Sequence, residues 1–176
     1  MHHTALRSDT GALAGLNTPV NYGSGTEWSK GLINKYSNTS IQLGLWLVGA
    51  CTDVAEGKLS KEIKRLATFF LSIHPTPVYL RIGYEFDSPE NDYKPLSYIA
   101  AFRTIVDDLR MYNVKNLHYV WHSYSQLPAG GYSQQDWYPG EASVYVCLSV
   151  CLCVYVGGWV CVCVCLWVCG CVGVSV

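Results

Sequence analysis

The chain has 176 residues, which suits one domain, and its 12 Lys and Arg nearly balance 13 Asp and Glu, for a net charge of −1. This balance argues against a nucleic-acid or anionic-membrane partner. The composition is uneven, because no charged residue follows Glu141 and eight of the nine cysteines follow Val144. We therefore predict a folded domain over residues 1–143 and a low-complexity Val/Cys-rich tail over residues 144–176.

The first 25 residues are small, polar and glycine-rich, which predicts loops. The segment Met1–Asp9 lacks the apolar core of a secretory signal. A short helix is expected from Thr26, because apolar residues recur at helical spacing. These residues are Trp28, Leu32, Ile33 and Tyr36.

The following segments alternate between strand and helix. Continuous apolar runs predict strands at Ile41–Ala50 and Pro77–Asp87, and a further strand is expected at Leu117–Trp121. Amphipathic patterns predict helices over about Ser60–Ile73 and Pro95–Tyr112. Strands separated by helices of this length form a parallel sheet with right-handed crossovers.

The stretch Pro77–Asp87 carries charge where a core strand is normally apolar. Arg81 lies inside it, and Glu85 stands at its carboxyl end. A buried carboxylate without a partner is costly, and in strand–helix barrels the active site is assembled at this end of the strands. The structural alternative is an Arg81–Glu85 ion pair that ends the strand. Position alone leaves both hypotheses open.

Aromatic side chains stand at the carboxyl ends of all three strands, at Trp46, Tyr84 and Trp121. Aromatic rings near a carboxylate suit sugars, because the apolar face of a sugar stacks on the ring while its hydroxyls bond to charged groups. Core filling is the common interpretation of any one of them, but three consecutive strands favour a shared sugar site. The histidines have no metal-ligand spacing outside the start of the chain, so no metal or cofactor is expected.

Three motifs resemble glycoside hydrolase family 26. Arg81–Phe86 resembles its Arg-x-x-His-Glu-Met segment at the end of the fourth barrel strand. Asn116–Ser123 resembles its fifth strand, Asn-(apolar)-x-(apolar)-Val-Trp, and Trp137–Glu141 resembles its Tyr-Pro-Gly-Asp segment before the sixth. The resemblance extends over about residues 11–141.

The resemblance implies an α/β fold, a partial (β/α)₈ TIM barrel from about the third strand to the start of the sixth, without the early strands. It implies a secreted, retaining hydrolase of O-glycosidic bonds in a mannan-like β-linked polysaccharide. Glu85 would be the proton donor, and the sugar site would be lined by Arg81, Tyr84, Trp121 and His122. Tyr84 stands where the family usually has His, so the identity of the sugar substrate is left open. Asp87-Ser88 stands where the family usually has Asn-Gly.

Retention requires a second carboxylate about 5–5.5 Å from the first. In the family this nucleophile is a Glu at the end of the seventh strand, and no carboxylate follows Glu141 in this sequence. We therefore expect no turnover by this chain. The alternatives are a non-catalytic carbohydrate binder and a truncated gene-model fragment.

The tail has three interpretations. Its 33 uncharged residues exceed the roughly 20 of a membrane span, which would make a tail-anchored protein. A disulfide or metal cluster is disfavoured, because alternating Val-Cys places the thiols on one face of a strand and offers no turn. We favour the interpretation that the tail is the translation of a simple DNA repeat, because a GT dinucleotide repeat reads as alternating GTG (Val) and TGT (Cys) codons. Such a segment is prone to aggregate.

Overall fold

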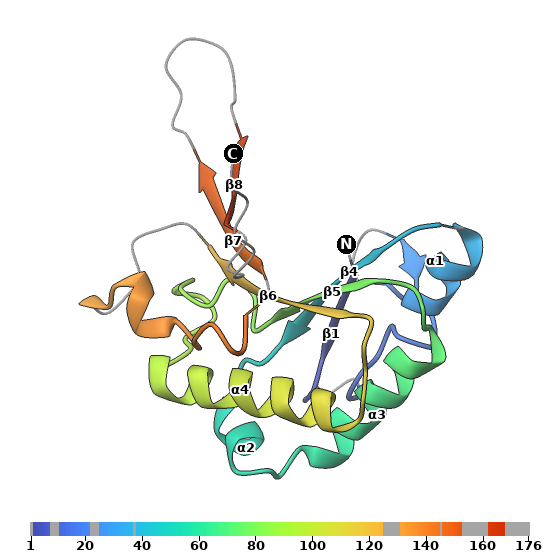
Figure 1. The fold of residues 1–176 in the computed structure, drawn as a ribbon, viewed down its shortest axis with the longest axis horizontal. Helices are drawn as coiled ribbons and strands as arrows, with labels where there is room; N and C mark the ends of the chain where they lie inside the picture. The colour runs from blue at the N-terminus through green and yellow to red at the C-terminus, as the bar shows by residue number, and fades with distance from the viewer. Residues whose placement is uncertain are drawn as a thin grey trace, which may run out of the picture.

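The computed structural model describes residues 2–7, 11–21, 25–36, 38–124, 131–144, 146–152 and 162–167. Its main feature is a six-stranded sheet in the order β1-β4-β5-β6-β7-β8 (Figure 1). In this sheet β1, β4, β5, β6 and β7 pair in parallel in that order, and β8 pairs antiparallel with β7. The strands are β1 (His2–Ala5), β4 (Ile41–Trp46), β5 (Val78–Ile82), β6 (Leu117–Ser123), β7 (Val146–Leu152) and β8 (Val162–Trp167).

Helices cover one face of this sheet. In Figure 1, α3 and α4 run beneath the strands, and α2 packs below α4. The helices are α1 (Ser29–Lys35), α2 (Cys51–Ala55), α3 (Ser60–Ser72) and α4 (Pro95–Met111), with a short 3₁₀ helix η2 (Gln134–Trp137). A small hairpin of β2 (Val20–Asn21) and β3 (Thr26–Glu27) precedes α1.

The core lies between the sheet and these helices. Leu43 and Leu45 of β4 and Leu80 and Ile82 of β5 are fully buried there. Because side chains alternate along a strand, the residues between them belong to the other face of the sheet. That face carries Arg81 of β5. The two strands therefore present apolar side chains to the helices and a charged side chain to the opposite face of the sheet.

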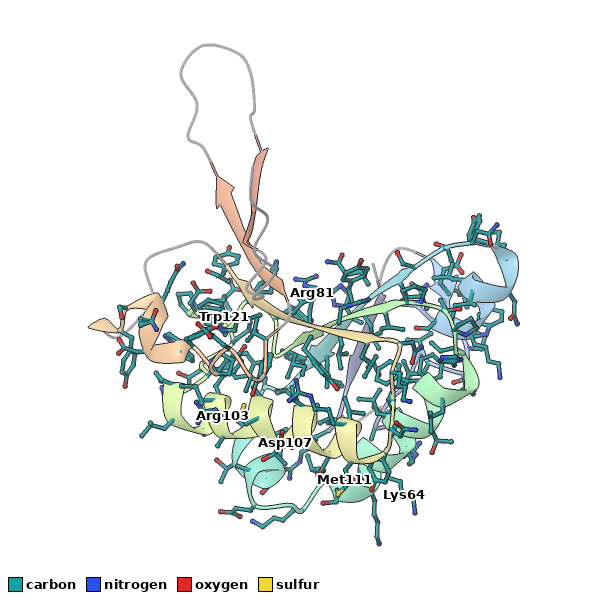
Figure 2. All side chains as sticks on the ribbon, in the orientation of Figure 1. Lys64, Arg81, Arg103, Asp107, Met111 and Trp121 are labelled. Atoms are coloured by element: carbon teal, nitrogen blue, oxygen red, sulfur yellow. The ribbon has the colours of Figure 1, made fainter. Side chains whose placement is uncertain are left out.

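Helix α4 also holds the segment that leads toward β7. Arg103 donates a hydrogen bond from Nε to the carbonyl oxygen of Pro139 at 2.7 Å, and Arg110 donates to that of Ala142 at 2.6 Å. In Figure 2, Arg103 lies along α4, while Arg81 and Trp121 lie at the sheet above it. These contacts hold the Tyr-Pro-Gly-Glu segment against α4.

The predicted α/β class and the parallel sheet of a partial TIM barrel are confirmed. The prediction of loops over the first 25 residues is wrong at β1, which pairs with β4 from His2↔Leu43 to Ala5↔Trp46. The fold therefore begins one strand earlier than expected. Backbone hydrogen bonds to a neighbouring strand place β1, and its own side chains carry no strand pattern. The helix expected from Thr26 begins at Ser29, because Thr26–Glu27 forms β3.

The expectation that the tail offers no turn is also wrong, because β7 and β8 pair antiparallel and the chain must reverse between them. The side chains of these two strands, including their thiols, lie outside the described part. Among the described residues, no helix is both long enough and apolar enough to cross a membrane.

The strand predicted over Pro77–Asp87 ends earlier, at Ile82, because the chain turns at Gly83. Gly83 has φ +53°, in the left-handed region that favours glycine. A Cβ there would lie 2.7 Å from Cε2 of Tyr98, whose hydroxyl donates to the carbonyl oxygen of Ile82. Glycine at this position thus lets the strand end against the core and turn toward Glu85.

We predict that Gly83→Ala lowers the free energy of unfolding by about 2–3 kcal/mol, through backbone strain plus the clash with Tyr98. Gly49→Ala is the matched control: Gly49 has φ +70° but open space around its missing Cβ. The control should cost about 1 kcal/mol, from strain alone. Urea unfolding followed by circular dichroism measures both. Equal losses for the two variants would contradict the steric role assigned to Gly83.

Candidate active site at the carboxyl end of the central strands

Arg81 is the largest buried charge near the carboxyl end of β5. Its side chain is 2% exposed, and its Nη2 lies 2.9 Å from Nδ1 and 3.2 Å from Nε2 of His122 on β6. Its guanidinium also lies over the ring of Tyr84, 5.0 Å from the centroid. Burial lowers the pKa of Arg81, and the charge of Glu85 opposes this shift. Arg81 therefore joins β5, β6 and the turn after β5.

His122 is buried and neutral. Burial, followed by the charge of Arg81, lowers its pKa from 6.5 to about 3. Because arginine only donates, the closer ring nitrogen, Nδ1, must accept its hydrogen bond. The backbone amide of Glu85 points at the same Nδ1 at 3.3 Å. We therefore assign the proton of the neutral ring to Nε2.

Glu85 follows β5 in an unusual backbone conformation. Its φ is +56°, which costs a residue with a side chain roughly 1–3 kcal/mol unless its surroundings impose it. The surroundings of Glu85 impose this conformation. Its amide donates to the carbonyl oxygen of His122 at 2.8 Å. Asn91 Nδ2 donates to the carbonyl oxygens of Tyr84 at 3.3 Å and of Glu85 at 3.0 Å. The side chain of Glu85 stays half-buried. Such strain at a half-buried carboxylate is a feature of functional sites.

The alternative hypothesis of an Arg81–Glu85 ion pair is wrong. The ion pairs of the described residues join other side chains, involving Arg7, Lys58, Lys94 and Arg110. The charge of Glu85 raises the pKa of Arg81 against the effect of burial, and Arg81 contacts His122 directly. The carboxylate of Glu85 is therefore not committed to ending the strand.

Tyr84 packs across the polar face of the sheet. Its ring lies 5.0 Å from that of His3 on β1, and a Cβ at Gly44 of β4 would lie 2.9 Å from Tyr84 Cε1 and 2.7 Å from His3 Nδ1. Glycine at position 44 thus admits both rings. Sequence reasoning missed His3 and Gly44, because β1 carries no strand signal and Gly44 lies inside an apolar run.

Asp87 is a second acidic residue that sequence reasoning did not place in the site. It is 2% exposed and accepts hydrogen bonds from Ser123 Oγ and from the Tyr124 amide, each at 2.5 Å. Gln134 Nε2 donates to the same Ser123 Oγ at 3.0 Å. Asp87 therefore ties the turn after β5 to the end of β6 and to η2. Its place directly after the Glu85-Phe86 pair was the available signal.

Trp121 lies beside this cluster rather than within it. Its ring stacks on Phe86, with centroids 4.5 Å apart and planes at 8°, and meets Tyr138 edge-on at 5.2 Å. One face of the indole is therefore covered by the protein. The contact of Trp121 with a sugar stays a prediction, as do the roles assigned to the other site residues.

The structure thus brings together four of the five predicted residues, Arg81, Tyr84, Glu85 and His122, at the carboxyl ends of β5 and β6. The described part of the chain contains no group of three His, Cys, Asp or Glu side chains that could hold a metal ion. What the cluster offers is a half-buried carboxylate on a rigid backbone, next to a buried cation, a neutral imidazole and aromatic rings. This combination suits proton transfer to a neutral, hydroxyl-rich substrate.

No protein-family model matches the chain. A β-1,3-xylanase from a Vibrio species is 29% identical over 130 residues, and a β-1,3-xylanase from an Alcaligenes species is 27% identical over 130 residues. Each match covers 73% of this chain, and the chain spans only 28% of the length of either relative. A solved GH26 β-mannanase from Bacteroides ovatus superposes with a TM-score of 0.50 and 21% identity, over 62% of this chain and 40% of the mannanase.

The predicted resemblance to glycoside hydrolase family 26 is confirmed. At this level of identity the mannanase shows the fold, which is that of part of a family 26 barrel.

We predict that the buried His122 lowers the free energy of unfolding at acidic pH. Because the pKa of His122 is lower in the folded chain than the unfolded value of 6.5, the unfolded state binds the proton more readily. The free energy of unfolding should therefore fall as the pH drops from about 6.5 toward about 3. Urea unfolding at several pH values should show a shallower slope for His122→Asn than for the unchanged chain. His74→Asn, at an exposed histidine, is the control and should keep the slope.

Proposed function

We propose that the protein hydrolyses O-glycosidic bonds of a β-linked polysaccharide, with retention of configuration and with Glu85 as the general acid/base. The observation that carries this proposal is the backbone of Glu85, which β6 and Asn91 hold in a left-handed conformation at the carboxyl end of β5. The family 26 fold and the two xylanase relatives support the reaction class. The large size of such substrates makes an extracellular location part of the proposal.

In the first step, the protonated Glu85 gives its proton to the leaving glycosidic oxygen while a nucleophilic carboxylate, which this chain does not supply after Glu141, forms an ester with the anomeric carbon. In the second, the carboxylate of Glu85 takes a proton from a water that attacks the anomeric carbon, and the nucleophilic carboxylate leaves. Arg81 and His122 are positioning residues in this scheme, because the carbonyl oxygen and the ring of His122 both bond to the Glu85 amide. Tyr84 lines the site from the side of β1 and β4.

The first substrate to test is β-1,3-xylan, with β-mannan second. Two relatives that carry the name β-1,3-xylanase match 130 residues of the chain, whereas the mannanase supports the fold alone. The tyrosine at position 84, where family 26 usually has histidine, also distinguishes this site from the mannan-like pattern.

A second candidate is carbohydrate binding without turnover. The retaining reaction requires a nucleophilic carboxylate about 5–5.5 Å from the acid. In the printed sequence no Asp or Glu follows Glu141, and the buried carboxylate nearest to Glu85 in sequence, Asp87, is engaged by Ser123 and Tyr124. We therefore propose that the 176-residue chain alone binds substrate without cleaving it.

We predict that Glu85→Gln lowers kcat for xylan by about 10²–10⁴-fold in a protein that supplies the nucleophile, because proton transfer is lost. An aryl xyloside with an acidic phenol as leaving group should lose less, since that group departs without a proton. Release of reducing ends and of the phenol measures the two rates. Glu90→Gln, an exposed carboxylate in the same loop, is the control and should keep the wild-type rates.

Equal losses on xylan and on the aryl xyloside would contradict the role of Glu85 as an acid. For the 176-residue chain, binding of xylo-oligosaccharide without release of reducing ends supports the second candidate. Turnover by that chain would rule it out.

A further inference from the structure

One short motif of the sequence lies outside the Glu85 site and carries a chemistry of its own. Asn38-Thr39-Ser40 fits the pattern Asn-x-Ser/Thr, with x other than proline, and no other asparagine of the chain does. Asn17-Thr18-Pro19 comes near it but has proline where the pattern requires serine or threonine. In secreted proteins this pattern is the acceptor of N-linked glycans, which are attached at surface loops.

The structure places this acceptor on the surface. Asn38, Thr39 and Ser40 are all exposed, and they lie between the end of α1 at Lys35 and the start of β4 at Ile41. Asn38 has φ +55°, a left-handed conformation that asparagine adopts more readily than most residues with a side chain. The motif is thus part of an exposed turn, which is where a bulky glycan can be accommodated.

A pocket beside Asn38 has room for one sugar unit. It has a volume of about 260 Å³ and lies between this turn and the loop that leads into β5. The Ile41 amide donates to the carbonyl oxygen of Pro77 at 2.9 Å, which holds the two segments together. The described residues that line the pocket are all uncharged: Ile33, Tyr36, Asn38, Thr39, Pro75, Thr76 and Pro77. Apolar rings and hydroxyl groups together suit a neutral sugar.

Tyr36 offers an aromatic surface within this pocket. It stands two residues before Asn38 and is 53% exposed. Lys35 Nζ lies 5.3 Å from the centroid of its ring, and the ring also borders a smaller neighbouring pocket of about 170 Å³. An exposed phenol ring this close to the attachment point is placed to stack on the C–H face of a pyranose.

We propose that Asn38 is N-glycosylated and that the first N-acetylhexosamine of the glycan packs against Tyr36 in this pocket. In the transfer, Nδ2 of Asn38 attacks the anomeric carbon of an oligosaccharide that is joined to a lipid through a diphosphate. A C–N bond forms and the C–O bond to the diphosphate breaks. The lipid diphosphate leaves with the bonding electron pair, and the amide nitrogen gives one proton to a base of the transferase. The tether then keeps the sugar at a high effective concentration beside the pocket.

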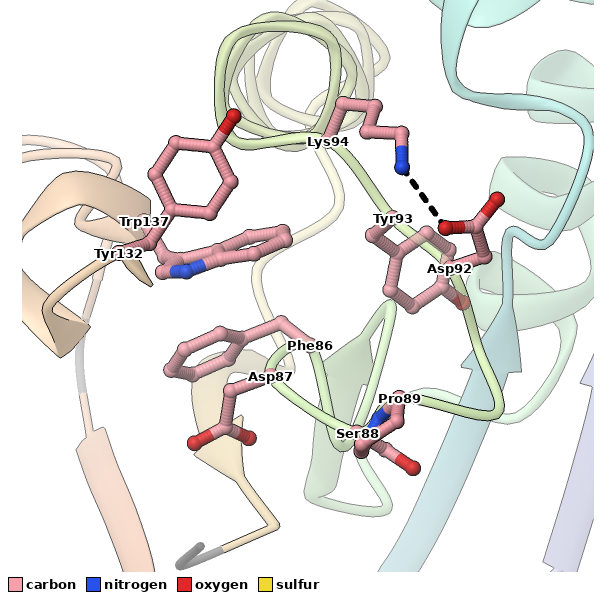
Figure 3. A pocket seen from close by; sticks show the side chains of 9 residues that line it. All are labelled: Phe86, Asp87, Ser88, Pro89, Asp92, Tyr93, Lys94, Tyr132 and Trp137. Atoms are coloured by element: carbon pink, nitrogen blue, oxygen red, sulfur yellow. Dashed lines mark hydrogen bonds and ion pairs between the residues drawn. The ribbon is translucent and has the colours of Figure 1, made fainter. Parts of the chain in front are cut away.

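The glycan lies away from the Glu85 site. Asn38 precedes β4 at the amino end of the strands, whereas Glu85 follows β5 at their carboxyl end. In Figure 1, α1 and the start of β4 lie on the opposite side of the molecule from the orange η2. The pocket of Figure 3, between the β5–α4 loop and the η2 region, belongs to that far side. A glycan on Asn38 therefore solubilises one end of the sheet and leaves the other open to a polysaccharide.

The first test translates the full chain, fused to a cleavable secretion signal, in the presence of endoplasmic-reticulum microsomes. We expect a product of lower electrophoretic mobility that peptide N-glycosidase returns to the mobility of the unmodified chain. Asn38→Gln and Ser40→Ala should each abolish this product, and Ser40→Thr should retain it. Asn17→Gln, at an exposed asparagine outside the pattern, is the matched control and should also retain it.

The second test measures the unfolding temperature of the glycosylated full chain, secreted from eukaryotic cells, by circular dichroism. An endoglycosidase that leaves one N-acetylglucosamine on Asn38 should not change this temperature. Complete removal by peptide N-glycosidase should lower it by about 2–4 °C, because the contact with the aromatic ring is lost. Tyr36→Ala should unfold at the same temperature after either treatment. Tyr132→Ala, at a tyrosine of similar exposure, is the control and should keep the difference.

A product that peptide N-glycosidase does not shift, or a shift that persists in Asn38→Gln, would overturn the modification. Translation in microsomes does not require a stable fold, so a destabilised variant still reports on the transfer. Equal unfolding temperatures after the two treatments of the unchanged chain would overturn the contact with Tyr36. The proposal shares with the proposed function only the extracellular location. Glu85→Gln should leave both results unchanged, so a failure of the hydrolytic role is recognised separately.

Discussion

The buried guanidinium of Arg81 is the constraint on which the rest of this site depends. A guanidinium that is 2% exposed loses its hydration and needs contacts that replace it. Here a neutral imidazole, that of His122 on the next strand, accepts its hydrogen bond, and the ring of Tyr84 lies against its face. His122 cannot take up a proton near neutral pH without placing two positive charges in contact, so its Nδ1 remains an acceptor. That acceptor and the neighbouring carbonyl oxygen then fix the amide of Glu85. The backbone geometry of Glu85 thus follows from the burial of Arg81.

A second set of contacts works on the other side of the same turn. Asp87 joins the loop after β5 to the end of β6 and, through Ser123, to η2. Phe86, between the two acidic residues, stacks on Trp121 and packs into the core. The chain therefore alternates, from Glu85 to Asp87, between a half-buried carboxylate, an apolar anchor and a buried carboxylate. Glu85 thus stays half-buried at the carboxyl end of β5, while Asp87 is held by Ser123 and the Tyr124 amide.

Much of this arrangement could be predicted from residue order. The helices α3 and α4 and the strands β4 and β5 lie within the predicted segments, and β6 begins at Leu117 as predicted but ends at Ser123, two residues after Trp121. Each of them buries a continuous or periodic apolar surface. Arg81 and Glu85 stood out, because charge inside a core strand requires an explanation. By contrast, β1 is held by its pairing with β4 and by the room that Gly44 leaves for the ring of His3. Neither contact produces a recognisable strand pattern in the residues of β1. The reversal between β7 and β8 was missed for a similar reason, since Val-Cys alternation favours a strand without indicating where its partner lies.

The sequence by itself determined the α/β class and the resemblance to family 26, and it singled out the carboxyl end of β5 as the candidate site. These depend on local composition and on motifs a few residues long. Only the tertiary structure decided that Arg81 contacts His122 rather than Glu85, that Trp121 has one face covered by Phe86, and that Tyr132 and Trp137 meet the β5–α4 loop around a pocket. The reason is physical: hydrogen bonds and ring contacts between side chains tens of residues apart depend on how strands and loops are placed in space, which spacing along the chain does not encode.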